Sequence, residues 1–190
     1  MKNPFLAGSK VYLRPLEPGD APAVAPWFNA PDVRQYLARY RPISVRAEEE
    51  FLEKTSRSEH DMLLGIVAVD GDVLIGCAGL HPIDWKNSQS GFGIVIGEQT
   101  YWQMGYGTET TTLLVGHAFR SLNLHRVWLH VYEDNPRAVR AYEKVGFRKE
   151  GVLRQDNYRH GRYWDTILMA ILRDEWMQKK QAEGSCDEGR

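Results

Sequence analysis

Residues 93–109 read GIVIGEQTYWQMGYGTE, and the interpretation of the whole chain starts from this stretch. Its first part, Ile94–Ile96, consists of β-branched residues between two glycines, a composition typical of a short strand. Two further glycines, Gly105 and Gly107, precede residues 108–120, which we predict to be a helix. A helix that begins after a glycine-bearing turn presents unpaired amides at the positive end of its dipole. The stretch therefore predicts a site for a phosphate-bearing ligand.

Three kinds of phosphate site are compatible with a glycine-rich turn at first sight. A Walker-type loop requires a lysine and a serine or threonine after its last glycine, but Thr108 and Glu109 follow Gly107. A dinucleotide fingerprint would have to use Gly105, Gly107 and Thr110, and it belongs early in a βαβ unit rather than past the middle of a chain. The third kind is a site for the pyrophosphate of coenzyme A, and a second motif favours it.

The second motif covers residues 135–147 and reads NPRAVRAYEKVGF. Asn135 precedes Pro136 as an N-cap precedes a proline at the first helical position, and Gly146 is placed to end the helix. Spacings of three and four residues put the following on one helix face: Ala138, Ala141, Tyr142 and Val145. The motif predicts a short amphipathic helix that is followed by a strand.

Taken together, in this order and at this separation, the two motifs resemble those of the GCN5-related N-acetyltransferases, the GNAT family. The branch that the chain resembles most holds the ribosomal-protein N-terminal acetyltransferases and the spermidine N-acetyltransferases, and the likeness runs from about Val11 to about Leu172. The resemblance implies a mixed α/β fold: a mostly antiparallel sheet of six to seven strands, with splayed central strands and helices on both faces. We expect residues 1–176 to form a single domain of this kind and residues 177–190 to be a disordered polar tail.

Composition sets limits on the class of protein. The chain has 190 residues, 43% hydrophobic and 26% charged, which suits one globular domain. A net charge of −1 gives no reason to expect a nucleic acid or an anionic membrane as partner. No signal peptide and no apolar run of about 18 residues is visible. Cys77 and Cys186 do not make a disulfide framework, so we expect a cytoplasmic protein, and we expect no metal site.

The resemblance implies acetyl-CoA as the acetyl donor. Backbone groups of Ile94, Val95 and Ile96 are expected to pair with the peptide-like pantetheine arm, and one of these amides is expected to hold the oxyanion. Further residues assigned to the cofactor by resemblance are Trp102, Gln103, Met104, Gly105, Tyr106, Gly107, Thr108, Asn135, Ala138 and Tyr142. The family often has glycine and a basic residue where this chain has Gln103 and Met104. Because one phosphate partner is lost, on the order of 1 kcal/mol if exposed, we expect somewhat weaker cofactor binding.

Tyr142 is the candidate general acid. It matches the tyrosine that has this role in the spermidine acetyltransferases that the chain resembles, and a phenol can protonate the departing coenzyme A thiolate. Glu98 is the candidate general base, because it lies just past the cofactor strand. Other groups that could take the proton from the amine are Glu133, Asp134, His81, His130 and water.

The acceptor stays open between a protein N-terminus, a polyamine and another small amine. The early helices and the last hairpin, which build the acceptor site in resembling proteins, contribute Trp27, Phe28, Tyr36, Tyr40, Trp85, Tyr158, Tyr163 and Trp164. Carboxylates that could attract a polyamine are Asp84, Asp156 and Asp165, whereas Arg39, Arg41, Arg154 and Arg159 suit an acidic acceptor. A homodimer is compatible with the sequence.

Direct transfer in a ternary complex is expected, because neither cofactor segment contains a cysteine that could carry the acetyl group. Two hypotheses from other classes remain. One is a non-catalytic acetyl-CoA-binding sensor or scaffold. The other is a nucleotide-binding protein, which the missing phosphate lysine opposes.

Overall fold

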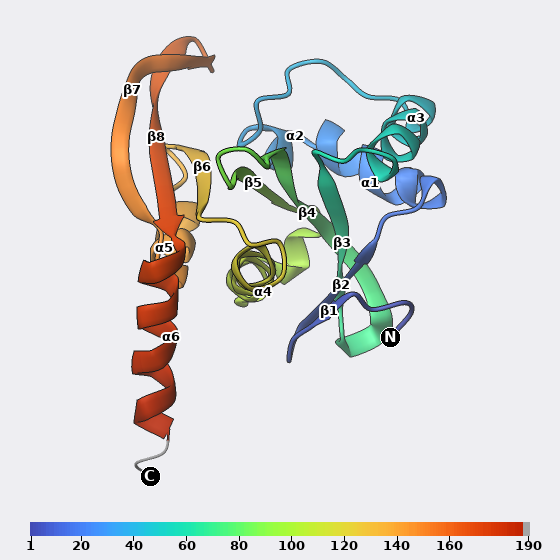
Figure 1. The fold of residues 1–190 in the computed structure, drawn as a ribbon. Helices are drawn as coiled ribbons and strands as arrows, with labels where there is room; N and C mark the ends of the chain where they lie inside the picture. The colour runs from blue at the N-terminus through green and yellow to red at the C-terminus, as the bar shows by residue number, and fades with distance from the viewer. Residues whose placement is uncertain (188–190) are drawn as a thin grey trace. The chain divides into compact units, whose positions relative to one another are not determined.

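The computed structural model describes residues 1–187 of the chain (Figure 1). These residues form two compact units, one made of residues 1–83 and 91–114 and the other of residues 84–90 and 115–187. The chain thus leaves the first unit for a short turn, returns, and leaves it again within the helix that follows the glycine loop. Each unit is described in turn.

The first unit holds the N-terminal strands and helices. Its strands are neighbours in the order β1 (Leu6–Ala7), β2 (Val11–Pro15), β3 (Met62–Ala68), β4 (Val73–Asp84) and β5 (Gln89–Ile96). Pairing from β1 to β4 is antiparallel. Its helices are α1 (Ala21–Asn29), α2 (Pro31–Arg34) and α3 (Val45–Ser56), with 3₁₀ turns η1 (Pro18–Asp20), η2 (Asp70–Asp72) and η3 (Gln99–Tyr101).

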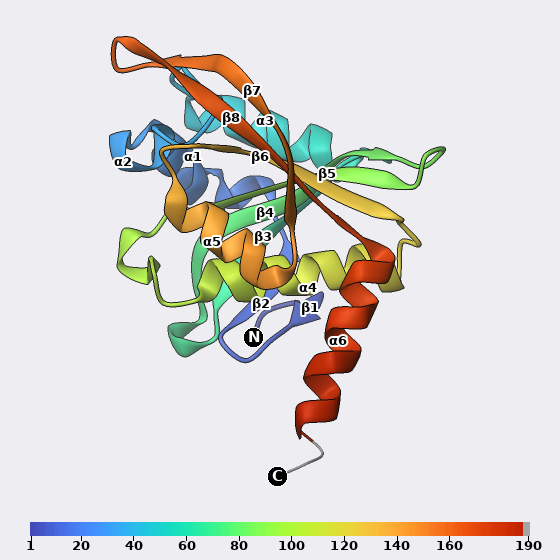
Figure 2. The same cartoon turned by 90° about the vertical axis from the view of Figure 1, so that its left-hand side faces the viewer.

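The second unit is built on a long C-terminal hairpin, drawn in orange to red in Figure 2. Its strands lie in the order β6 (Arg126–Tyr132), β8 (Arg162–Leu172) and β7 (Arg148–Arg159), all antiparallel. Its helices are α5 (Pro136–Val145) and α6 (Arg173–Asp187), and α4 (Tyr106–Arg120) begins in the first unit and ends in this one. In β6 the residues Val127, Leu129 and Val131 are buried and alternate with more exposed neighbours, as expected for a strand with two distinct faces.

The predicted mixed α/β, mostly antiparallel fold class is confirmed. The described residues contain eight strands rather than six to seven, because the two-residue strand β1 pairs with β2. The expectation of a single domain over residues 1–176 remains a prediction.

The expected disordered tail requires a correction. Residues 177–187 belong to α6, while residues 188–190 lie outside the described part of the chain. Helix α6 is tied down at its start, because Trp176 is 2% exposed and its ring centroid lies 5.8 Å from that of Phe119. Further along, Lys179 Nζ donates to the carbonyl of Lys144 at 2.5 Å. These long-range contacts are not visible in the polar composition of the segment.

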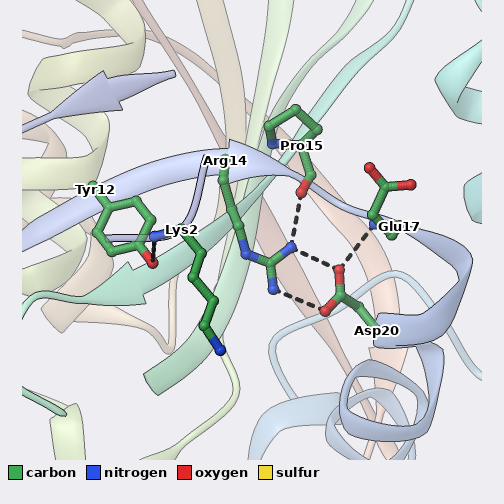
Figure 3. A network of polar contacts seen from close by, with 6 residues as sticks. All are labelled: Lys2, Tyr12, Arg14, Pro15, Glu17 and Asp20. Atoms are coloured by element: carbon green, nitrogen blue, oxygen red, sulfur yellow. Dashed lines mark hydrogen bonds and ion pairs between the residues drawn. The ribbon is translucent and has the colours of Figure 1, made fainter. Parts of the chain in front are cut away.

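A guanidinium–carboxylate pair fixes the turn from β2 into α1 (Figure 3). Arg14 Nη1 and Nη2 donate to the two carboxylate oxygens of Asp20, each at 2.8 Å, and Nη1 also donates to the carbonyl of Pro15 at 2.8 Å. The Glu17 amide donates to the same carboxylate at 2.9 Å. Partial burial favours the neutral carboxyl, but Arg14 and the Glu17 amide hold the pKa of Asp20 below its usual value. The bidentate pair therefore positions α1 at the end of β2.

Helix α1 brings Trp27 onto the end of β5. Trp27 belongs to a buried cluster with Leu16, Val24, Leu52 and Cys77. A Cβ atom at Gly97 would lie 2.0 Å from a ring atom of Trp27, so the indole rests directly on the glycine backbone.

The two amides that follow β5 are both held by β4. Those of Gly97 and Glu98 donate to the carbonyl of Ile75, at 2.9 and 3.1 Å. The direction in which the chain leaves the strand is thereby fixed.

Between β5 and α4 two residues have backbone angles in the left-handed region. Gln103 has φ 62° and Gly105 has φ 89°. The Trp102 indole Nε1 donates to the carbonyl of Ile96 at 2.8 Å, which ties the loop back to the strand. Helix α4 begins at Tyr106, two residues before its predicted start, and its first bond runs from the Glu109 amide to the Gly105 carbonyl at 3.0 Å.

We predict that Gly97→Ala lowers the free energy of unfolding by about 3 kcal/mol, because the new methyl group would overlap a buried, rigid indole. Gly19→Ala is the matched control, since a Cβ atom there meets nothing within 4 Å. That change should leave stability the same or raise it by less than about 1 kcal/mol. Chemical denaturation of both variants measures the difference, and equal effects would show that the contact of Trp27 with Gly97 is not tight.

A second prediction concerns the left-handed backbone at Gln103, whose side chain is exposed. Gln103→Gly removes the Cβ strain and should raise the free energy of unfolding by about 0.5 kcal/mol after the entropy of glycine is counted. Gln103→Val should lower it by about 1 kcal/mol, because a β-branched residue tolerates this region poorly. Thermal unfolding of the two variants tests the backbone geometry; shifts in the same direction would contradict it.

Candidate functional site

The backbone groups of the predicted cofactor strand alternate between the side of β4 and the opposite side. Hydrogen-bonding direction alternates along a strand, and the amide of Gly97 faces β4. Val95 faces the same way, since its carbonyl oxygen would lie 2.1 Å from a Cβ atom built at Gly76. The backbone groups of Ile94 and Ile96 therefore point to the opposite side. A peptide-like chain could pair with them there, although the Ile96 carbonyl already accepts a bond from the Trp102 indole.

The start of α4 packs against this strand. A Cβ atom at Gly107 would lie 3.9 Å from Ile94 Cδ1 and 4.0 Å from Ile96 Cγ1, so strand and helix are in ordinary contact here. The structure thus brings together most of the predicted phosphate site, which comprises Trp102, Gln103, Met104, Gly105, Tyr106, Gly107 and Thr108. Tyr106 is further fixed by an edge-on contact with Tyr101, with ring centroids 5.2 Å apart.

This loop has the features of an anion site. The amides of the first helical turn lack intrahelical partners and lie at the positive end of the dipole. Gln103 and Gly105 have positive φ angles, and backbone that changes handedness in this way can direct successive amides at an anion. Met104, which replaces the family's basic residue, is 52% exposed and adds no charge.

Glu98, the candidate base, is held at the end of β5. Its Oε1 accepts a hydrogen bond from Trp27 Nε1 at 2.9 Å. The next residue, Gln99, donates through Nε2 to Asp32 at 3.1 Å. The Glu98 carboxylate is thus positioned by a neutral donor, and its role as a base remains a prediction.

The second motif forms α5 with the predicted ends. Asn135 Oδ1 accepts from the amide of Ala138 at 3.2 Å and caps the helix, and Gly146 ends it with φ 120°. Asn135, Ala138 and Tyr142 are all partly buried residues of this helix or its cap, in the second unit. Cofactor contacts of these three residues remain predictions.

Tyr142 is shielded from water and has an aromatic neighbour. Its ring packs against Phe147, with centroids 5.8 Å apart. Burial raises the pKa of Tyr142 to about 12. The hydroxyl group consequently keeps its proton throughout the pH range in which enzymes work.

The three carboxylates considered for a polyamine accept hydrogen bonds from residues of their own hairpins. Asp84 accepts from the backbone and side chain of Asn87, at 3.0 and 2.6 Å, and these bonds lower its pKa. Asp156 accepts from the hydroxyl of Thr166 at 2.8 Å. Asp165 accepts from the amide of Gln155, also at 2.8 Å. All three carboxylates therefore already have hydrogen-bond partners within the protein.

Several of the basic and aromatic candidates also contact other side chains of the protein. Arg39 lies over the ring of Phe28, at 5.2 Å from the centroid. Arg159 pairs with Asp134 and lies over the ring of Tyr132. Tyr158 and Tyr163 are 63% and 61% exposed and pack on each other at 5.0 Å. Tyr40 and Trp85 are exposed as well, at 80% and 47%, so all four rings have surface that a ligand could reach.

Two contacts of the site were not indicated by the sequence. Trp27 reaches Glu98 across 71 positions, and Lys10 Nζ reaches the carbonyl of Met104 across 94 positions, at 2.9 Å. No local pattern signals either one, because both arise from the pairing of distant strands and helices.

Two other kinds of feature are absent from residues 1–187. Every helix in this range is too short or too polar to cross a membrane. Within the same residues no group of three or more histidine, cysteine, aspartate or glutamate side chains is arranged to hold a metal ion.

Comparison with known proteins agrees with the motifs. The model of the acetyltransferase (GNAT) domain matches residues 10–148, well over half of the chain. The chain is 28% identical over 173 residues to the uncharacterized N-acetyltransferase YoaA of Bacillus subtilis, covering 90% of this chain and 97% of the relative. It is also 28% identical over 175 residues to the spermidine N(1)-acetyltransferase of Vibrio cholerae, covering 91% and 99%.

Solved structures give the same result. The crystal structure of spermidine N-acetyltransferase from Vibrio cholerae in complex with CoA and spermine superposes with a TM-score of 0.83 at 28% identity, covering 90% of this chain and 99% of that one. The chain belongs to the GNAT acetyltransferase family and is an acetyl-CoA-dependent N-acetyltransferase.

Proposed function

We propose that this enzyme moves the acetyl group of acetyl-CoA directly to a primary aliphatic amine, with Tyr142 donating a proton or hydrogen bond to the departing sulfur. Two observations, each within its own unit, support the proposal: a glycine-bearing turn before α4 that is suited to an anion, and a tyrosine on α5 that keeps its proton. The first feature is suited to hold the phosphates, and the second is suited to leaving-group chemistry.

The residues present fit acetyl-CoA. The pyrophosphate would lie on the loop amides around Gly105 and Gly107, and the pantetheine arm would use the backbone edge of Ile94 and Ile96. When bound, acetyl-CoA supplies the thioester that the amine attacks. The chain would orient the thioester and keep water from it. It would also help to remove a proton from the amine and donate a hydrogen bond to the departing sulfur.

The raised pKa of Tyr142 defines what this residue can do. A hydroxyl group with a pKa of about 12 donates a hydrogen bond at any working pH. Full transfer of its proton to a thiolate with an ordinary pKa near 8.5 is uphill by roughly 3.5 units, or about 5 kcal/mol. Tyr142 therefore acts by donating to sulfur as negative charge develops there, and the coenzyme A thiol takes its proton from solvent or from the amine afterwards.

Proton removal from the amine is assigned to Glu98 or to water near it. The Glu98 carboxylate is held by Trp27 through Oε1, which leaves Oε2 for a water or an ammonium group. A primary ammonium has a pKa near 10, so only a small neutral fraction attacks at neutral pH unless a base helps.

Polyamines are the first acceptors to test, because two of the relatives compared are named spermidine N(1)-acetyltransferases. Peptides with a free N-terminus are the second. A homodimer is a separate part of the proposal, and sedimentation checks it. We expect calorimetry to show selective binding of acetyl-CoA over ATP and NAD, followed by thiol release with at least one amine. Tight binding without thiol release across the amine panel would favour a sensor instead.

Tyr142→Phe is expected to lower kcat by about 100-fold while the Kd of acetyl-CoA stays within about twofold, because only the donor to sulfur is lost. Tyr132→Phe is the matched control, a partly buried tyrosine of the same unit whose pKa burial also raises. Steady-state kinetics and calorimetry on both variants give the result. An unchanged kcat for Tyr142→Phe would remove this residue from the mechanism.

The pH dependence of the wild type adds a check on the same residue. Because its pKa is raised, the hydroxyl group stays protonated up to about pH 12, and kcat should not fall between pH 8 and pH 10 through loss of this proton. An alkaline decline in that window that is present in the wild type and absent from Tyr142→Phe would contradict the assignment.

A further inference from the structure

Lys10, in the turn between β1 and β2, extends its side chain to the phosphate loop. Its Nζ donates to the carbonyl of Met104 at 2.9 Å. The same nitrogen would lie 3.5 Å from a Cβ atom built at Gly105, the residue just before α4. A positive charge from the N-terminal hairpin is therefore placed beside the loop whose own basic residue is missing.

The backbone around Lys10 is held in place by the first turn of α4. Glu109 accepts hydrogen bonds from the amides of Ser9 and Lys10 and from the Ser9 hydroxyl group. A Cβ atom at Gly8 would lie 2.2 Å from Glu109 Oε1, so the turn approaches this carboxylate as closely as a glycine allows. The position of Lys10 is thus a built feature of the hairpin and not a chance orientation of a long side chain.

The carboxylate of Glu109 and the ammonium group of Lys10 have different hydrogen-bond partners. The negative charge of Glu109 is directed at the two amides and the hydroxyl group, which partly neutralise it. Within residues 1–187, Lys10 Nζ forms no salt bridge with a carboxylate. An ammonium group has three donors, and one bond to Met104 leaves two of them available.

We propose that Lys10 binds a phosphate group of acetyl-CoA and so replaces, from a distant part of the chain, the cation that Met104 removed from the loop. The inference rests on the proposed function, since it takes the loop before α4 as the phosphate site. It also replaces the expectation of weaker cofactor binding, because the lost partner is restored from outside the motif. Lys10 contributes to affinity and not to the acetyl transfer step.

The alternative is that Lys10 only fastens the loop through the Met104 carbonyl. Glutamine at position 10 keeps a neutral donor but removes the charge, and arginine keeps the charge. Lys2→Gln is the matched control, because it removes the same charge from an exposed lysine in the same unit whose amide, rather than its side chain, bonds to Tyr12. The four proteins differ little in packing, so all are expected to fold.

The test measures the Kd of acetyl-CoA by calorimetry for wild type, Lys10→Gln, Lys10→Arg and Lys2→Gln. We expect Lys10→Gln to weaken binding about fivefold and to flatten its dependence on ionic strength. Lys10→Arg and Lys2→Gln should stay within about twofold of wild type. The kcat at saturating acetyl-CoA should be the same for all four.

Two analogues of acetyl-CoA show which phosphate group Lys10 contacts. S-acetylpantetheine has no phosphate, so its KM should be unchanged by Lys10→Gln. With dephospho-acetyl-CoA, a persisting effect of Lys10→Gln assigns the pyrophosphate and a vanished effect assigns the 3′-phosphate.

An equal loss of affinity for S-acetylpantetheine would overturn the proposal in favour of a fastening role, and so would unaltered binding of acetyl-CoA by Lys10→Gln. Failure of the proposed function is distinguishable, because the wild type itself would then either not bind acetyl-CoA or bind it without thiol release.

Discussion

The contact between the Trp27 indole and the backbone of Gly97 sets the geometry on which the phosphate loop depends. It fixes the point at which the chain leaves β5, and the Ile75 carbonyl reinforces it by accepting both of the next two amides. From there the chain has few residues in which to reach α4, so it uses left-handed backbone at Gln103 and Gly105. Close packing at Gly97 thus fixes the point from which the loop before α4 begins.

The elements whose determinants are local could be predicted from the sequence. Helix α5 starts after Asn135 and ends before Gly146 as expected, because a cap, a proline and a glycine all lie within the helix or next to it. Helix α4 starts two residues earlier than predicted, since Tyr106 and Gly107 carry no capping pattern. The family likeness drew on such local motifs, and this explains why it sufficed for the fold and for the class of reaction.

What could not be predicted depends on residues far apart in the chain. The helical state of residues 177–187 is stabilised through Trp176 and Lys179, whose partners lie on other elements. The acid strength of Tyr142 likewise follows from burial beside Phe147, and a sequence shows only the ordinary value for a phenol. That difference changes the chemistry assigned to Tyr142, from a full proton donor to a hydrogen-bond donor.

The hydrogen bonds from Ser9 and Lys10, in the β1–β2 turn, to Glu109 of α4 have a consequence for how the protein folds and how it should be handled. These bonds join residues about 100 positions apart, so they cannot form before most of the chain has been made. The loop before α4 then gains its contact with Lys10 only when residues 8–10 are in place. A tag or deletion that disturbs Gly8–Lys10 would leave an enzyme that is folded, retains its motifs and is nevertheless impaired in substrate capture at low donor concentrations.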